Sequence, residues 1–256
     1  MDLKQTVGLW VNDTASILHD LQTIKDLGFD YIVARVLSRV GDKFVPTQPA
    51  SMAELITNAA EIGIRTDCWY FAYPDNIQAQ IDAVAAALPD SARNLILDVE
   101  DPWENRSQGA VLAKDLCSGI ASAIQHKADL QLSTFYYTSA HSVPYTAFLA
   151  HCESLMPQVY RVPAKNGGLT SVDLTINRTI GDDPTLAKQS LGGLLIATVN
   201  RPEMLDAVTA HTSKFQGVNV WLWDGDTGSV ITDPGVRGHG AVWKAAIQSY
   251  KDSLPK

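Results

Sequence analysis

Residues 94–101 read NLILDVED, and this stretch is the best guide to the fold. Its apolar part, residues 95–97, is typical of a parallel strand that is buried on both faces. Side chains two residues apart lie on the same face of a strand, so Asp98 and Glu100 point the same way. In α/β barrels the carboxyl ends of the strands carry the functional groups. The stretch therefore predicts a buried parallel strand whose carboxyl end carries functional side chains.

Similar apolar runs recur along the chain at intervals of roughly 30 residues, separated by amphipathic stretches. The predicted strands cover residues 7–12, 31–38, 66–73, 94–101, 131–138, 156–162, 194–200 and 218–224. Apolar side chains three and four residues apart predict helices between the strands, and Trp243, Ile247 and Tyr250 mark the last helix. Residues 164–193 are polar and glycine-rich, and we expect a long loop there with one short helix near 184–190.

This alternation over 256 residues predicts an α/β fold, a single (β/α)8 TIM-like barrel that forms one domain over residues 1–256. A doubly wound open sheet is the alternative. Such sheets usually carry a glycine-rich phosphate-binding turn after the first strand, whereas residues 11–14 read VNDT. The barrel is therefore the favoured fold.

The composition excludes several classes of protein. Hydrophobic residues make up 46% of the chain and charged residues 19%, which allows a large core and excludes a disordered chain. The net charge of −8 argues against binding to nucleic acid or to anionic membranes.

Residues 1–6, MDLKQT, do not begin a signal peptide. We expect a cytoplasmic protein, or a phage-associated or secreted one that uses a route without a signal; the oligomeric state stays open.

No motif points to a metal or a cofactor. The histidines lack zinc-binding spacing, and no phosphate-binding loop or nucleophile elbow is present in the sequence. Cys68, Cys117 and Cys152 stand far apart without a paired motif, so we expect buried free thiols, with a disulfide between two of them as the alternative. We therefore expect neither a metal nor a cofactor.

Asp98 and Glu100 are the candidate catalytic residues. Two carboxylates held close together and partly out of water raise at least one pKa. A carboxyl group that is still protonated near neutral pH can act as a general acid. The alternative is that both are solvated loop residues that cap the next helix.

Other strand ends supply candidate substrate-binding residues. An aromatic lining beside carboxylates suits sugars, which present apolar C–H faces and hydroxyl edges, although core packing is the alternative for any single aromatic. Arg35 lies within an apolar strand, where a buried charge needs a partner. The candidates are Trp10, Arg35, Tyr70, Tyr73, Tyr136, Trp221, Trp223 and Asp224.

These segments resemble glycoside hydrolase family 25, the lysozyme-like muramidases. The likeness lies in residues 95–100 above all, and in residues 30–35, 69–72, 135–139 and 220–223. The resemblance implies a barrel that cleaves β-1,4 bonds in peptidoglycan or a related N-acetylated glycan, as phage endolysins do. It implies Glu100 as the general acid and Asp98 as the residue that assists the substrate's acetamido group or stabilises the oxocarbenium-like transition state. Tyr136 or Tyr137 would hydrogen-bond that acetamido group.

Two positions depart from the family pattern. The family's first strand carries an aspartate in a Gly-x-Asp pattern, whereas this chain has Gly8-Leu9-Trp10. The last strand lacks the family's glutamine after its tryptophan and continues into Asp224. These departures keep a second hypothesis open, a catalytically inactive barrel that binds glycan or forms part of a larger assembly. A third is a metal-assisted hydrolase that uses Asp98, Glu100 and Asp224.

Overall fold

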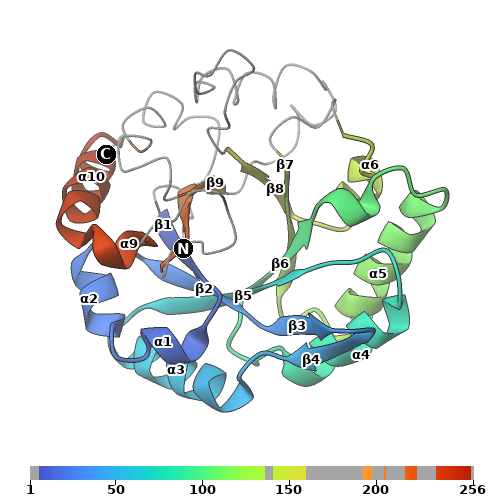
Figure 1. Ribbon diagram of the computed structural model, residues 1–256, viewed down its shortest axis with the longest axis horizontal. Coiled ribbons are helices and arrows are strands. Elements are labelled where there is room, and N and C mark those ends of the chain that lie inside the picture. Colours follow the sequence, from blue (N-terminus) through green and yellow to red (C-terminus); the bar gives the residue numbers. More distant parts are fainter. Residues whose placement is uncertain are drawn as a thin grey trace.

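The computed structural model describes residues 6–135, 141–159, 205, 217–223 and 235–254, and the backbone of residues 193–197. Its centre is a curled sheet of parallel strands with helices on the outside (Figure 1). The strands of this sheet are β1 (Thr6–Val11), β2 (Tyr31–Arg35), β5 (Arg65–Phe71), β6 (Asn94–Val99), β7 (Asp129–Phe135), β8 (Ser154–Gln158), β9 (Gly193–Ala197) and β10 (Gly217–Trp221). Each of them overlaps one of the strands predicted from sequence.

The strand pairing follows the order β1-β10-β9-β8-β7-β6-β5-β2, and β2 pairs again with β1, as in a closed barrel. All of these pairs are parallel, and β8 meets β9 at Gln158 and Leu195. The fold is thus α/β with a curled parallel sheet. Helices follow six of these eight strands within the described residues, and the segments after β8 and β9 lie largely outside them. The complete (β/α)8 repeat, the single domain and the short helix near residues 184–190 stay predictions.

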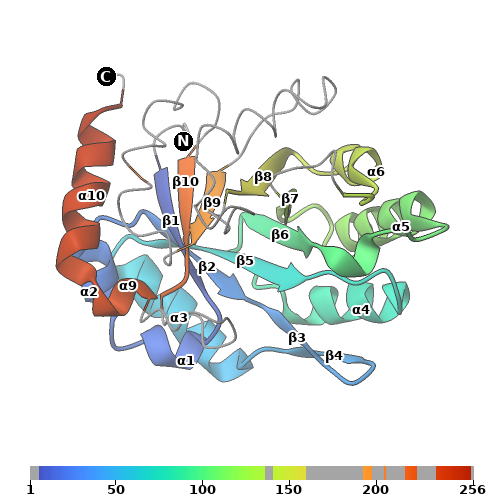
Figure 2. The ribbon, with the colours of Figure 1, turned by 45° about the horizontal axis from the view of Figure 1, so that its top comes forward.

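The helices cover the outer face of the sheet (Figures 1 and 2). They are α1 (Thr14–Ile17), α2 (Leu21–Asp26), α3 (Pro49–Glu61), α4 (Ile77–Ala87), α5 (Gly109–Ala123), α6 (Tyr145–Leu149), α9 (Gly235–Gly238) and α10 (Gly240–Asp252), with a 3₁₀ turn, η1, at Asp101–Trp103. The stripe of Trp243, Ile247 and Tyr250 is buried, as its spacing predicts. No helix in the described part of the chain has the length and apolar character to cross a membrane.

The second predicted strand was too long. β2 ends at Arg35, and the chain then forms an antiparallel hairpin of β3 (Leu37–Val40) and β4 (Lys43–Pro46). Gly41 in its turn has a φ of 61°, a conformation that glycine adopts without strain. The hairpin extends outward from the end of β2 (Figure 2), so apolar residues beyond Arg35 belong to it and not to the barrel.

Alternating side chains along the strands separate two apolar cores. The outer core lies between the sheet and the helices and includes Leu97 and Val99 of β6. The inner core fills the barrel and consists of Trp10, Tyr31, Val33, Trp69, Ile96, Met156 and Leu222, with Phe71 and Trp221 packed against it. Because Ile96 faces inward, Asp98 and Glu100 face the interior as well.

A network of hydrogen-bonded polar side chains lies inside the barrel at the amino-terminal ends of the strands. The Asp67 carboxylate forms an ion pair with Arg65 at 2.8 Å and accepts a hydrogen bond from the Asn94 side chain at 2.9 Å. The Asn94 carbonyl in turn accepts a hydrogen bond from Gln131 Nε2 at 2.7 Å. The buried Asp67 charge is thereby compensated, as a buried carboxylate requires. This network is structural and lies at the opposite end of the strands from the two acids.

Candidate active site

Asp98 and Glu100 mark the carboxyl end of β6. Asp98 is 5% exposed and pairs in register with Ser133 on β7 and with Phe71 on β5. Glu100 follows the last residue of β6, precedes the η1 turn and is half-buried. The strand thus places one carboxyl group deep in the barrel mouth and the next nearer to solvent, both on the inward face.

Gln158 joins the two acids. Its Nε2 donates to Asp98 Oδ1 at 2.8 Å and to Glu100 Oε1 at 2.7 Å. The side chain is 5% exposed and comes from the end of β8, across β7 from the acids. Gln158 was not among the residues predicted from sequence, because one glutamine belongs to no motif. Its signal was a polar residue two positions after Met156, on the inward face of a predicted strand.

Burial controls the electrostatics of both acids. Loss of solvent raises the pKa of Asp98 well above its ordinary value, and the charge of Glu100 raises it further. Hydrogen bonds from Ser133 and Gln158 lower the pKa of Asp98, but less than burial raises it. The pKa of Glu100 is also raised, first by burial, while the hydrogen bond from Gln158 opposes the shift. A carboxyl group with a raised pKa can hold a proton for general acid catalysis.

Three tryptophans fill the barrel interior. The ring centroids of Trp10, Trp69 and Trp221 lie 5.0 to 5.7 Å apart. Trp10 is fully buried and donates to Asn219 Oδ1 at 3.3 Å, and Trp69 donates to the Val11 carbonyl at 3.1 Å. Trp10 therefore serves as packing in this structure, whereas Trp221 is partly exposed and can contact a ligand.

Arg35 lies half-buried at the end of β2. Its Nε donates to the Leu37 carbonyl at 3.1 Å, and its guanidinium lies 5.3 Å from the Trp69 ring centroid. Burial lowers the pKa of Arg35, and electrostatic interactions with Tyr73 and then with Asp98 oppose that shift. No carboxylate of the described residues lies within ion-pair distance of it. Within the described residues, Arg35 thus favours the charged form of Asp98 without forming an ion pair with it.

Tyr73 belongs to an aromatic strip that leads outward onto the hairpin. Its ring centroid lies 5.0 Å from that of Phe71 and 5.8 Å from that of Phe44 on β4. The Arg39 guanidinium lies 4.4 Å from the Tyr73 ring and is held by two hydrogen bonds to Asp75. All three residues are half-buried.

Two of the predicted binding residues lie elsewhere. Tyr70 is fully buried in the outer core, because its neighbours Trp69 and Phe71 face inward and alternation turns Tyr70 toward the helices. Trp223 is also buried in the outer core and donates to Asp20 at 3.3 Å, since β10 ends at Trp221 and the chain turns outward. Neither side chain reaches the acid pair.

Tyr136, Tyr137 and Asp224 lie outside the described residues, so their roles stay predictions. Within the described part of the chain, no group of three histidine, cysteine or acidic side chains is arranged to hold a metal ion. All three cysteines are buried and free.

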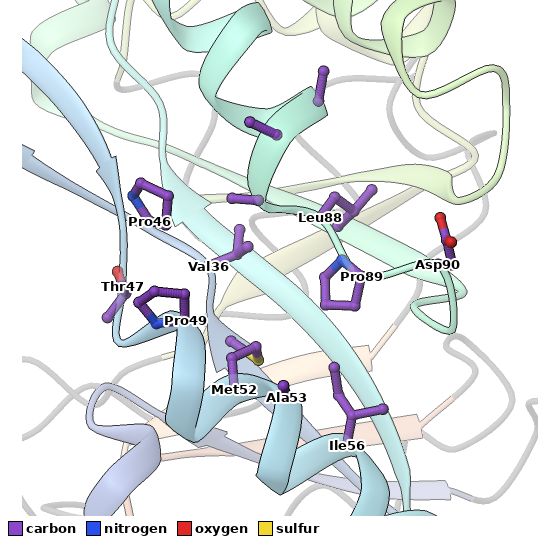
Figure 3. A pocket seen from close by; sticks show the side chains of 13 residues that line it. Val36, Pro46, Thr47, Pro49, Met52, Ala53, Ile56, Leu88, Pro89 and Asp90 are labelled. Atoms are coloured by element: carbon purple, nitrogen blue, oxygen red, sulfur yellow. The ribbon is translucent and has the colours of Figure 1, made fainter.

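A separate cavity lies on the side of the barrel. It has a volume of about 470 Å³ and is lined by the hairpin, by Met52, Ala53 and Ile56 of α3, and by the end of α4 (Figure 3). Its lining is apolar apart from Thr47 and Asp90, and it includes none of the candidate site residues. It is distinct from the mouth of the barrel.

The comparisons with known proteins show the fold. No protein-family model matches the sequence, and a search of curated protein sequences finds no match. Among solved structures, a chitinase from Ipomoea carnea aligns with a TM-score of 0.60 and 10% identity, over 97% of this chain and 100% of the chitinase. A β-glucuronidase from Ruminococcus gnavus in complex with D-glucuronic acid aligns with a TM-score of 0.66 and 10% identity, over 95% of this chain. The chain spans 49% of that glucuronidase.

Proposed function

We propose that this protein is a glycoside hydrolase in which Asp98 and Glu100 perform acid catalysis on peptidoglycan or a related N-acetylated glycan. The observation that carries the proposal is the inward-facing acid pair at the barrel mouth, in which burial raises both pKa values. The fold is shared with a chitinase and a β-glucuronidase, which supports a glycosidase. The proposal includes a single, complete (β/α)8 barrel of the muramidase type.

Glu100 is the more exposed acid and is therefore assigned as the proton donor. It protonates the glycosidic oxygen while the bond from that oxygen to the anomeric carbon breaks. The substrate's acetamido oxygen bonds to the anomeric carbon, and the Asp98 carboxyl group accepts a hydrogen bond from the acetamido N–H, which orients the acetamido group for this attack. Water then attacks the anomeric carbon, the bond from the acetamido oxygen to that carbon breaks, and Glu100 recovers its proton from the water. This route differs from displacement by an enzyme carboxylate, as in other substrate-assisted families.

The other residues of the proposed site bind the sugar. Trp221 offers an aromatic face at the mouth, Tyr73 continues it toward the hairpin, and Arg35 presents a partly desolvated cation. Tyr136 and Asp224 stay in the proposal as substrate-binding residues on the grounds of their sequence positions.

A barrel that binds glycan without cleaving it is the second candidate. The observation in its favour is Trp10, which fills the position of the family's first-strand aspartate and is fully buried. Asp13, further along, does not replace that aspartate, because its carboxylate caps α1 by accepting from Ala15 and Ser16.

The test is the release of reducing ends from purified peptidoglycan and from chitin oligosaccharides. We expect turnover by the wild type and a loss of at least about 10²-fold in Glu100→Gln, because the amide has no proton to donate. Glu104→Gln is the matched control, since Glu104 lies in the same loop and pairs with His141. Sugar binding without any release of reducing ends would favour the second candidate.

A further inference from the structure

The amide group of Gln158 lies between the two acids. Its Nε2 carries two N–H groups, and its contacts of 2.8 Å and 2.7 Å account for one on each carboxylate. The Ser133 hydroxyl lies 3.5 Å from the same nitrogen, too far to be a strong competitor. The amide presents its nitrogen to both acids, and each carboxyl group has an oxygen that can accept whether or not the group is protonated. Asp98 and Glu100 are therefore bridged by a donor.

A bridging donor changes what the acid pair can do with a proton. Two carboxyl groups in direct contact share one proton and titrate as a unit. Here the amide occupies the place of a shared proton, so each acid has its own hydrogen bond. Oε1 of Glu100 is held as an acceptor, and no described residue hydrogen-bonds to Oε2.

We propose that Gln158 is a positioning residue: its amide gives Asp98 and Glu100 one hydrogen bond each, so that they do not share a single proton between them, and leaves Glu100 Oε2 as the oxygen that carries the transferable proton. This inference rests on the proposed function, because it assigns the proton that cleavage would use. Gln158 itself touches no substrate in this scheme. It acts through the geometry and the protonation of the two acids.

Gln131 provides a matched control. It is also a buried glutamine, it lies on the adjacent strand β7, and its Nε2 also donates to a side-chain oxygen. That acceptor is the neutral Asn94 at the opposite end of the strands. Replacing each glutamine with methionine keeps the length of the side chain and removes the donor.

The experiment compares the wild type, Gln158→Met and Gln131→Met. The carboxyl carbons of Asp98 and Glu100 are followed by NMR through a pH titration, and kcat and KM are measured against pH on peptidoglycan and chitin oligosaccharides. In Gln158→Met we expect the apparent pKa of Glu100 to rise by about one unit, because a donor to the charged form is lost. The alkaline limb of the kcat profile should move with it. The value of kcat should fall about 10- to 100-fold, as for a hydrogen bond to a charged group, with KM changed less than about threefold.

The outcomes separate this inference from the proposed function. If no glycan is cleaved but the titration of the acids moves in Gln158→Met and not in Gln131→Met, the glycosidase proposal falls and the role of Gln158 stands. If glycans are cleaved while the titration and the pH profile of Gln158→Met match the wild type, the role of Gln158 is overturned. That role is also overturned if Gln131→Met moves both equally. Should Gln158→Met not fold, Gln158→Asn serves instead, since its shorter side chain can reach one acid but not both.

Discussion

The buried carboxyl group of Asp98 lowers the free energy of unfolding at neutral pH. Burial keeps its proton bound in the folded state at pH values where the unfolded chain has released it. The folded state then binds more protons than the unfolded state, so the free energy of unfolding falls as the pH rises. The loss begins at the ordinary carboxyl pKa of about 4 and continues up to the raised pKa of Asp98.

Asp98→Asn is therefore expected to stabilise the protein at neutral pH. Each pKa unit of the shift corresponds to about 1.4 kcal/mol, and the amide avoids this loss because it does not titrate. Urea denaturation at pH 4 and pH 7 measures the free energy of unfolding of both proteins. The difference between the variant and the wild type should be small at pH 4 and larger at pH 7. Asp82→Asn on the exposed face of α4 is the control. An equal effect of Asp98→Asn at both pH values would show that burial does not raise the pKa of Asp98.

At the scale of the elements, Gly8 allows strand β1 to pack closely against its neighbours in the barrel. A Cβ on Gly8 would lie 2.3 Å from Asn219 Oδ1 and 2.4 Å from the Tyr31 ring. Tyr31 and Asn219 are joined by a hydrogen bond of 2.8 Å, so neither side chain can move away without losing it. Tyr31 and Asn219 can therefore pack directly against the backbone of β1 only because residue 8 is glycine.

Gly8→Ala should lower the free energy of unfolding by about 1–3 kcal/mol, the usual effect of overpacking a core. Thermal and urea denaturation measure the change. Gly240→Ala is the matched control, because its Cβ would lie 3.6 Å from Leu27, an ordinary contact, at the start of α10. We expect that variant to be neutral or slightly stabilising. Equal effects of the two substitutions would argue against close packing at Gly8.

The elements also show what the sequence could predict. The strands were predictable because each contains an apolar run, and the alternating direction of side chains along a strand places Asp98 and Glu100 on the same face. Tyr70 was misplaced because its position near a strand end was weighed without the alternation that turns it outward. Gln158 was not predictable as a partner, since the contact joins residues 58 and 60 positions apart in the chain. The hairpin was missed because its first residues continue an apolar run.

At the scale of the whole molecule, α10 fixes the last part of the described chain to the first. Lys251 Nζ contacts the Gly28 carbonyl and Asp30 Oδ1, both at 2.7 Å. Asp30 in turn accepts a hydrogen bond from the Val7 amide of β1 at 2.8 Å. The buried side chains of α10 cover the same region. The pairing of β1 with β10 is thus supported from outside by a helix that follows both strands.

Removal of the chain from residue 240 onward should abolish cooperative unfolding. The loss exposes the sites of Trp243, Ile247 and Tyr250, each worth about 1.5–3 kcal/mol when buried, against a usual total stability of about 5–15 kcal/mol. Circular dichroism during urea denaturation checks this. Val242→Ala, on the exposed side of the same helix, should leave the midpoint unchanged. A truncated chain with the wild-type midpoint would show that α10 does not hold the barrel together.

The three tryptophans of the inner core also give the molecule an optical property. At centroid separations of 5.0 to 5.7 Å their electronic transitions interact, so the circular dichroism of the group depends on how the three rings are arranged. Trp221 reaches the surface, whereas Trp10 and Trp69 are shielded from quenchers in solution. A ligand that covers Trp221 would therefore alter the near-ultraviolet circular dichroism of the whole group. The barrel mouth thus carries its own label-free reporter of occupancy, which responds to binding whether or not any bond is cleaved.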